Sequence, residues 1–303
     1  MNNYERLEGM VAATFTPMDE NGDVNLSVID KYADWIASTP VKGVFVCGTT
    51  GEFSSLTIDE RKAVLEKWVA SAAKRFKVIA HVGSNCQRDA MELASHAAQT
   101  GADAIASIAP SFFKPGTVDE LVDFFAPICR AASELPFYYY NMPSITGVNL
   151  PVDKFLIEGK KKIPNLVGTK FTHNNLMEMG VCIELEQHRF EVLHGYDEIL
   201  ISGLAMGAVA GVGSTYNLSL IHNHAIFESM KKNEVETARA WQMKSIRTVE
   251  VIIKYGGGVR GGKAIMKLIG LDCGSCRLPI KAFSTEEYEK LKGDLDAIKF
   301  FEF

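Results

Sequence analysis

The sequence predicts a parallel (β/α)8 (TIM) barrel followed by a C-terminal helical extension. Short runs rich in β-branched residues alternate with longer amphipathic stretches along most of the 303 residues, and this unit repeats eight times. A doubly wound open sheet is the main competitor, but no G-x-G-x-x-G motif follows the first run. We therefore expect a closed barrel, with functional groups at the carboxyl ends of its strands.

The strands are expected where short apolar runs contain β-branched or aromatic residues. In chain order these runs are residues 10–15, 43–47, 77–82, 103–109, 136–141, 166–171, 190–195 and 207–213. Helical stretches lie between them. In residues 57–75, for example, Leu65 and Val69 share one face and Arg61 and Lys67 lie opposite, which predicts an amphipathic helix with its charges outward. Residues 86–101 and 117–134 follow the same pattern.

The chain is expected to divide into a barrel that carries the active site (residues 1–225) and a helical region packed on it (226–303). Helical patterns cover residues 233–255 and 284–301. The glycine-rich stretch 255–262 lies between helical segments and does not follow a strand. We therefore expect it to be a connection and not a phosphate-binding loop. The histidine pair of "HNH" (222–224) lies in a helical stretch and is expected at the surface.

Composition excludes several classes of function. The net charge of -5 offers no basic footprint for nucleic acid or for an anionic membrane surface. The first residues show no cationic segment ahead of a long apolar run, and no apolar run approaches the length of about 18 residues expected of a membrane span. A cytoplasmic protein that binds neither nucleic acid nor membrane is expected. The six scattered cysteines do not resemble a disulfide framework, and the single C-x-x-C at 273–276 is taken as incidental.

Lys170 is the residue that most needs an explanation, because it ends an apolar strand, "LVGTKF". Burial disfavours the charged ammonium, and a neutral amine is a nucleophile that can form a Schiff base with a ketone or aldehyde. The alternative is a lysine paired with a carboxylate at a strand end. Schiff-base chemistry also needs a proton shuttle, and Tyr140 ends the preceding strand. Tyr138 shares a face with Tyr140, so the aromatic strand also fits a purely structural role.

Two further rim segments carry polar groups. The loop "GTTGE" follows the second strand and offers the hydroxyls of Thr49 and Thr50 with freed backbone amides, a nest suited to a carboxylate or phosphate; a tight turn without ligand is the alternative. The segment "HGYDE" ends the seventh strand with Asp197 and Glu198. Adjacent carboxylates can accept from sugar hydroxyls or bind a divalent metal, but no H-x-H or H-x-x-x-H pattern on one element supports a metal.

These motifs together resemble the superfamily of class I, Schiff-base aldolases that includes N-acetylneuraminate lyases and dihydrodipicolinate synthases. The resemblance covers nearly the whole chain and runs through "GTTGEFSSLTIDER", "YYYNMPSITG", "LVGTKFTH", "GVGSTYN" and "GGVRGGKAIMKLIGL". It implies a homotetramer without metal or organic cofactor. It also implies that Lys170 is the Schiff-base lysine, Tyr140 the proton-shuttling tyrosine, and Thr49 and Thr50 the holders of a pyruvoyl carboxylate.

Two departures separate the branches of the superfamily. The synthases usually carry an arginine two residues after Pro-Ser in the strand-five motif, where this chain has Ile145. The synthases also supply a tyrosine across the subunit interface from a loop that corresponds to "PSFFKPG" here, where this chain has Phe112 and Phe113. The motif "GYDE" is instead similar to the sialic-acid branch. This similarity implies that Gly195, Asp197, Glu198 and Ser214 bind a polyhydroxy tail, and that Thr172 lies near the scissile C3–C4 bond.

The expected activity is therefore the reversible cleavage of N-acetylneuraminate to N-acetylmannosamine and pyruvate. Its partners are these small molecules. Three alternatives remain at this point. One is another pyruvate-dependent class I aldolase or synthase, such as a dihydrodipicolinate synthase or a 2-keto-3-deoxy sugar acid aldolase. The others are a metal-dependent aldolase and a non-catalytic, ligand-binding barrel.

Overall fold

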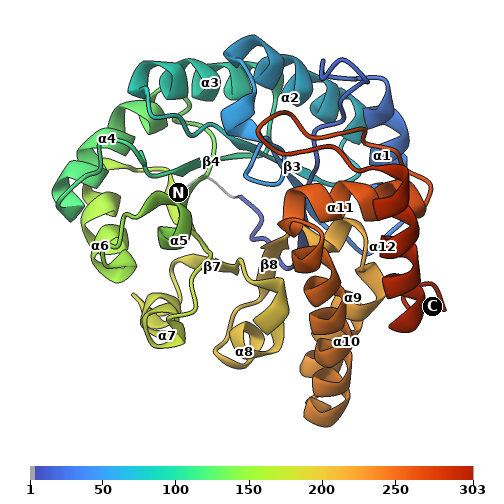
Figure 1. The fold of residues 1–303 in the computed structure, drawn as a ribbon. Coiled ribbons are helices and arrows are strands. Elements are labelled where there is room, and N and C mark those ends of the chain that lie inside the picture. Colours follow the sequence, from blue (N-terminus) through green and yellow to red (C-terminus); the bar gives the residue numbers. More distant parts are fainter. Residues whose placement is uncertain (1–3, 303) are drawn as a thin grey trace.

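Eight parallel strands form a closed barrel in the computed structural model, which describes residues 4–302. Each strand pairs with the next one in sequence, and β1 pairs with β8 to close the ring, as seen down the barrel axis in Figure 1. The barrel and all eight expected strands are confirmed. The strands are β1 Gly9–Ala13, β2 Gly43–Val46, β3 Lys77–His81, β4 Ala104–Ile108, β5 Phe137–Asn141, β6 Leu166–Phe171, β7 Glu191–His194 and β8 Ala210–Gly213.

The α-helices surround the barrel and extend beyond it. They are α1 Val28–Ala37, α2 Ile58–Ala72, α3 Gln87–Thr100, α4 Val118–Arg130, α5 Pro143–Thr146, α6 Val152–Lys162, α7 Leu176–Glu184, α8 Leu200–Ala205, α9 Leu220–Lys231, α10 Val235–Lys254, α11 Gly257–Leu268 and α12 Thr285–Ala297. Short 3-10 helices follow three of the strands: η1 Phe53–Ser55, η2 Asp197–Ile199 and η3 Thr215–Asn217. The expected division at residue 225 falls within α9 and stays a prediction.

Several helix starts can be read directly from the sequence. The Thr57 side chain accepts a hydrogen bond from the backbone N–H of Glu60, and the Glu60 side chain accepts one from the N–H of Thr57. This capping box begins α2. Thr117 begins α4 in the same way, and Ser284 begins α12. These caps satisfy amide groups that would otherwise lack partners at the start of a helix.

Side chains inside the barrel form a core separate from the one beneath the helices. Tyr138 and Tyr140 belong to the inner core with Val11 and Leu193, whereas Tyr139 packs outward against Phe155 of α6. This is the alternation expected of a strand with both faces buried. Because Tyr140 and Lys170 are neighbours in the ladder, both side chains point into the barrel.

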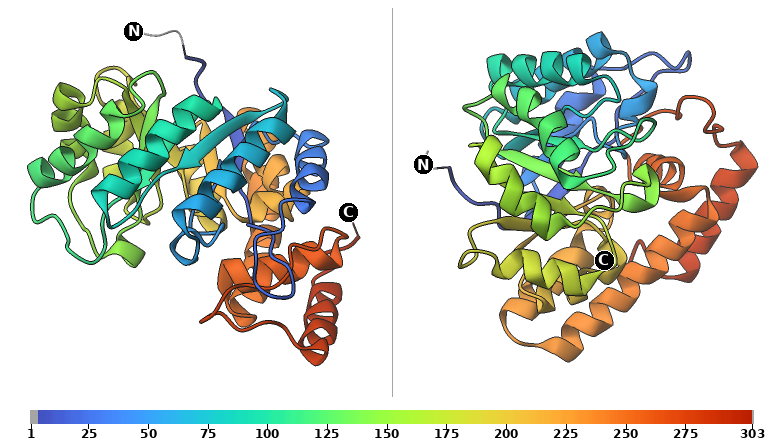
Figure 2. Two further views of the ribbon diagram at one scale, coloured as in Figure 1. Left: turned by 90° about the horizontal axis from the view of Figure 1, so that it is seen from above. Right: turned by 90° about the vertical axis from the view of Figure 1, so that its left-hand side faces the viewer.

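The C-terminal helices lie at one end of the barrel. Figure 2 shows the segment that leads into β1 at one end and α11 and α12 at the other. Residues of α10 and α11 close one side of the cavity described below, which identifies this end as the one where the strands have their carboxyl termini. No helix within residues 4–302 has both the length and the apolar character needed to cross a membrane.

The expectation that Arg61 lies on the solvent-exposed face of α2 was wrong. Its side chain is buried, and its guanidinium donates to the carbonyls of His81 (2.7 Å) and Gly83 (2.9 Å). Helical periodicity assigned this arginine to solvent because charged residues are seldom buried unless paired. Two backbone carbonyls at the end of β3 make the burial tolerable.

Candidate active site

Lys170 lies inside the carboxyl end of the barrel, with its side chain almost wholly buried. Its Nζ is 4.1 Å from the centre of the Tyr140 ring and 4.3 Å from that of Phe45. Aromatic faces attract a cation without neutralising it as a carboxylate would. Within the described chain Lys170 has no ion pair, so the alternative of a lysine paired with a carboxylate is wrong. The amine is left accessible to a carbonyl carbon.

Tyr140 presents its hydroxyl to the same space. The hydroxyl lies 3.3 Å from Oγ1 of Thr49 and 3.0 Å from Sδ of Met142, to which it donates. A sulfur is a weak acceptor, so this hydrogen bond can be exchanged for one to a reacting oxygen. The arrangement provides an acid–base group next to the Lys170 amine. No role could be predicted for Met142, because a methionine after a strand is usually a packing residue.

Thr49 and Thr50 form a short loop beyond β2, and both side chains are half-buried. Non-glycine residues with left-handed backbone flank it, Cys47 (φ 54°) and Glu52 (φ 57°). Such conformations are sparsely populated and need support from the surrounding structure. Both threonines line the same cavity as Lys170, as a carboxylate site next to the amine requires.

Asp197 begins η2 and is held against β8. A Cβ added to Gly213 would lie 1.7 Å from Oδ1 of Asp197, so only glycine allows this approach. Thr215 donates to Oδ2 of Asp197 from its backbone N–H (2.9 Å) and from Oγ1 (2.7 Å), whereas Oδ1 has no partner. Burial raises the pKa of Asp197 to about 6, and the hydrogen bonds from Thr215 oppose this rise.

Thr172 and Gly195 meet just beyond the carboxyl ends of the neighbouring strands β6 and β7. A Cβ on Gly195 would lie 2.0 Å from Oγ1 of Thr172, so the glycine leaves room for the hydroxyl. This Oγ1 is buried and lacks a hydrogen-bond partner, like Oδ1 of Asp197. Both atoms belong to residues that line the same cavity. Buried polar atoms are nearly always paired, so a ligand with hydroxyl groups would supply the missing partners.

One cavity of about 280 Å³ joins these groups. All nine residues predicted from the sequence line it: Thr49, Thr50, Tyr140, Lys170, Thr172, Gly195, Asp197, Glu198 and Ser214. Among the described residues of its lining, Lys170 is the only cationic side chain. The cavity therefore combines one lysine with the hydroxyls of Thr49 and Thr50 and the carboxylates of Asp197 and Glu198.

Part of the lining was not predicted from the sequence. Helices α10 and α11 close one side of the cavity with Val249, Ile252, Ile253, Gly258 and Val259. The helical pattern of residues 233–255 predicted α10, but it could not reveal which of its faces would meet the barrel. Met142, Tyr196 and Thr215 also line the cavity, and each lies within one of the motifs quoted above although no role was predicted for it.

Two expectations about the C-terminal half were wrong. The glycine-rich stretch is not a connection, because α11 begins at Gly257. A Cβ on Gly261 would lie 2.8 Å from the carbonyl of Ile252, so these glycines permit close packing of α11 on α10. The "HNH" segment lies only partly at the surface, where His224 is half-buried. His222 and Asn223 are buried, and Asn223 donates to Oγ1 of Thr215 (3.0 Å), behind Asp197.

Metal ligands do not gather in this part of the molecule. Within residues 4–302 no three His, Cys, Asp or Glu side chains are arranged to hold an ion. The cysteines of the C-x-x-C motif are free thiols; Cys273 is buried and Cys276 is half-buried. Burial raises the pKa of both thiols, to about 12 and about 11, which favours unreactive thiols.

Comparison with known proteins agrees with this geometry. The chain matches the Dihydrodipicolinate synthetase family over residues 6–298. It is 41% identical over 300 residues to the N-acetylneuraminate lyase of Mus musculus, covering 98% of this chain and 94% of that protein. These matches span nearly the whole chain, well beyond the motifs that line the cavity.

Solved structures give the same result. The N-acetylneuraminate lyase of Proteus mirabilis superposes with a TM-score of 0.94 at 35% identity, covering 98% of this chain and 100% of that one. The N-acetylneuraminate lyase (sialic acid aldolase) of Aliivibrio salmonicida gives a TM-score of 0.94 at 38% identity, covering 98% of each chain. Both the sequence and the structural similarity favour the sialic-acid branch over the synthases.

Proposed function

Because this chain belongs to the dihydrodipicolinate synthetase family, we propose that it cleaves N-acetylneuraminate reversibly to N-acetylmannosamine and pyruvate. The observation that carries the proposal is the cavity that Lys170 shares with the carboxylates of Asp197 and Glu198. A 2-keto acid with a polyhydroxy tail has complementary groups at both ends. The protein is then a carbon–carbon lyase that works through a lysine Schiff base.

In the first step the Lys170 amine attacks the C2 ketone of the open-chain sugar. Thr49 and Thr50 hold the C1 carboxylate, and Tyr140 carries protons as the carbinolamine loses water to form an iminium. This cation withdraws electrons, so the C3–C4 bond breaks once the C4 hydroxyl has lost its proton. Tyr140, Thr172 or the substrate's own carboxylate takes that proton. N-acetylmannosamine then leaves.

The remaining enamine is protonated at C3, and water releases pyruvate and restores the free Lys170 amine. Every step uses the lysine, acid–base groups and water, so the proposal includes no metal and no organic cofactor. We also propose a homotetramer in the cytoplasm, as the family resemblance and the composition imply. The exposed Phe112 and Phe113 support the tetramer, because paired aromatic side chains at a surface favour a protein contact.

The cavity lining argues against the synthase branch. A second carboxylated substrate would need a second cation, and Lys170 is the only one among the described lining residues. Ile145, at the position of the synthase arginine, is 63% exposed and does not line the cavity. Asp197 and Glu198 would repel another carboxylate but accept hydrogen bonds from sugar hydroxyls.

The test is pyruvate release from N-acetylneuraminate, measured by coupling to lactate dehydrogenase with EDTA present. Steady turnover supports the proposal, and turnover that EDTA abolishes would indicate a metal-dependent aldolase instead. Borohydride should trap pyruvate on the unmodified protein but not on Lys170→Ala. If pyruvate is trapped and N-acetylneuraminate is not cleaved, a panel of other aldehyde acceptors would identify a different aldolase.

A further inference from the structure

The loop that carries Thr49 and Thr50 is strained at both of its ends. Cys47, before the loop, and Glu52, after it, both have positive φ angles near 55°, which side chains other than glycine rarely adopt. A four-residue loop between two such residues keeps its shape only if the rest of the fold holds it. The groups that hold each end therefore help to determine where the two threonine hydroxyls lie.

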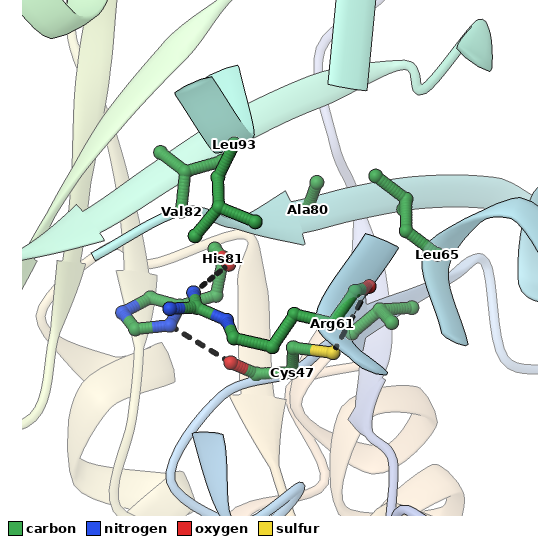
Figure 3. Close-up of a pocket in the computed structure, with 8 residues that line it drawn as sticks. Cys47, Arg61, Leu65, Ala80, His81, Val82 and Leu93 are labelled. Carbon is green, nitrogen blue, oxygen red and sulfur yellow. Dashed lines mark hydrogen bonds between the residues drawn. The ribbon is translucent and has the colours of Figure 1, made fainter. Parts of the chain in front are cut away.

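His81, at the end of β3, holds the first end of the loop. Its Nδ1 lies 2.8 Å from the carbonyl oxygen of Cys47, and the ring is fully buried beside Phe45 and Phe53. Figure 3 shows the His81 ring turned toward the Cys47 carbonyl, with the Arg61 guanidinium next to it. Arg61 donates to the His81 carbonyl, so it fixes the backbone from which the histidine projects.

The tautomer of His81 follows from its second contact. Its Nε2 lies 3.3 Å from the backbone N–H of Ile108, a group that can only donate, so Nε2 is the acceptor. Nδ1 therefore carries the proton and donates to the Cys47 carbonyl. Burial, reinforced by the nearby Arg61, lowers the pKa of His81 well below its usual value, which keeps the ring neutral. Both ring nitrogens of His81 therefore make hydrogen bonds to the backbone.

A buried ion pair holds the second end. Nζ of Lys263, on α11, lies 2.7 Å from Oε1 of Glu52, and both side chains are only 2% exposed. The other Glu52 oxygen accepts from the backbone N–H of Arg277 (2.9 Å), and Lys263 also donates to the carbonyl of Ser275 (3.0 Å). A buried pair with additional hydrogen bonds is geometrically demanding, so it fixes the C-terminal helices against the loop.

We infer that His81 and Lys263 are positioning residues that hold the Thr49–Thr50 loop in its carboxylate-binding shape from opposite ends. Neither residue lines the cavity, so neither is expected to touch the substrate. The inference rests on the proposed function, because it assigns these residues to the affinity for pyruvate. It also explains why a C-terminal region outside the barrel contributes to a site inside it.

The test measures the pyruvate concentration that gives half-maximal borohydride trapping, together with the KM for pyruvate in the condensation with N-acetylmannosamine. His81→Leu and Lys263→Met should each raise both values by about tenfold, the usual effect of losing one positioning hydrogen bond. The kcat at saturating pyruvate should change much less. A purely structural role would lower the amount of active protein and leave the half-saturating concentration unchanged.

Matched variants separate positioning from folding. Lys267→Met removes an exposed ion pair with Asp272 one turn further along α11 and should leave pyruvate affinity unchanged. His81→Asn keeps a donor near the position of Nδ1 and should recover most of the affinity. The double variant Glu52→Gln, Lys263→Met removes both buried charges, so it should fold even if Lys263→Met alone does not, yet still bind pyruvate weakly.

The outcomes are distinguishable. Unchanged half-saturation in His81→Leu and in the double variant would overturn the inference while leaving the proposed function intact. If pyruvate is trapped but N-acetylneuraminate is not cleaved and N-acetylmannosamine is not condensed, the proposed substrate is wrong. The inference is then still tested by pyruvate trapping alone. If the unmodified protein traps no pyruvate, both the Schiff-base proposal and the inference are wrong.

Discussion

Replacing Asp197 by asparagine should make the protein more stable and less able to bind its substrate. The carboxyl group is buried, and its pKa lies at about 6 against a usual value of 3.8. Ionising it inside the fold therefore disfavours the native state at neutral pH, by about 3 kcal/mol as an upper limit. Asparagine has the same shape and can still accept from Thr215, but it carries no charge.

The pH dependence follows from the direction of the shift. Because the folded-state pKa is raised, the native state binds more protons than the unfolded chain between about pH 4 and pH 6, so stability falls as the pH rises through this window. Asp197→Asn has no carboxyl group to ionise at this position, so its stability does not fall for this reason as the pH rises. Its advantage should be about 1.5 kcal/mol at about pH 5 and about 3 kcal/mol at about pH 7.5. Urea unfolding at the two pH values measures the difference.

Asp294 of α12, which does not line the cavity, provides a control of opposite sign. The pKa of Asp294 is lowered by hydrogen bonds from Lys254 and Tyr255, so its carboxylate stabilises the fold at neutral pH and this contribution is lost as the pH falls. Asp294→Asn should therefore be less stable than the parent at neutral pH and keep its activity. If Asp197→Asn is also less stable at neutral pH, or its advantage is the same at both pH values, the argument from burial is wrong.

Three other predictions concern single side chains. Tyr140→Phe should lower turnover by roughly 10²- to 10⁴-fold, measured as pyruvate release; near-normal turnover would make Tyr140 a packing residue. Gly213→Ala places a methyl group 1.7 Å from Oδ1 of Asp197, so the KM for N-acetylneuraminate should rise while pyruvate trapping is unchanged. If the affinities for N-acetylneuraminate and for pyruvate fall equally, the tail does not bind at a separate site. Glu191→Ala removes the carboxylate that accepts hydrogen bonds from the Leu7 N–H and the Tyr138 hydroxyl, so the free energy of unfolding should fall by about 1–3 kcal/mol for each unpaired donor. The kcat should be unchanged, because Glu191 lies at the opposite end of the barrel. A lower kcat in the folded protein would show that the two ends are coupled.

The barrel was predictable because its strands carry a strong local signal. Parallel strands buried on both faces read as short continuous apolar runs, and "GVFVC" and "KVIAHV" are of this kind. Lys170 and Tyr140 were recognisable for the opposite reason, since a lysine and a tyrosine at strand ends depart from that pattern. Carboxyl ends of parallel strands meet at one face of a barrel, so these departures had to lie close together.

The parts that could not be predicted depend on contacts between distant segments. Helical periodicity places Arg61 on the outer face of α2, and nothing near it in the sequence shows that the carbonyls of His81 and Gly83 will receive its guanidinium. The glycines of α11 look like a connection, because a low helix propensity is the only local property they have. Their use becomes visible only when α10 lies against them.

Glu52 and Lys263 show most clearly why the site extends beyond its motifs. One residue closes a loop after the second strand, and the other lies on a helix beyond the barrel, so no local pattern connects them. Their pairing orders the loop that carries Thr49 and Thr50, whereas the chemistry belongs to Lys170 and Tyr140. Burial of two opposite charges is tolerable only when each satisfies the other. The C-terminal helices and the active-site loop must therefore assemble together, and a chain shortened before α11 should lose pyruvate binding even if its barrel folds.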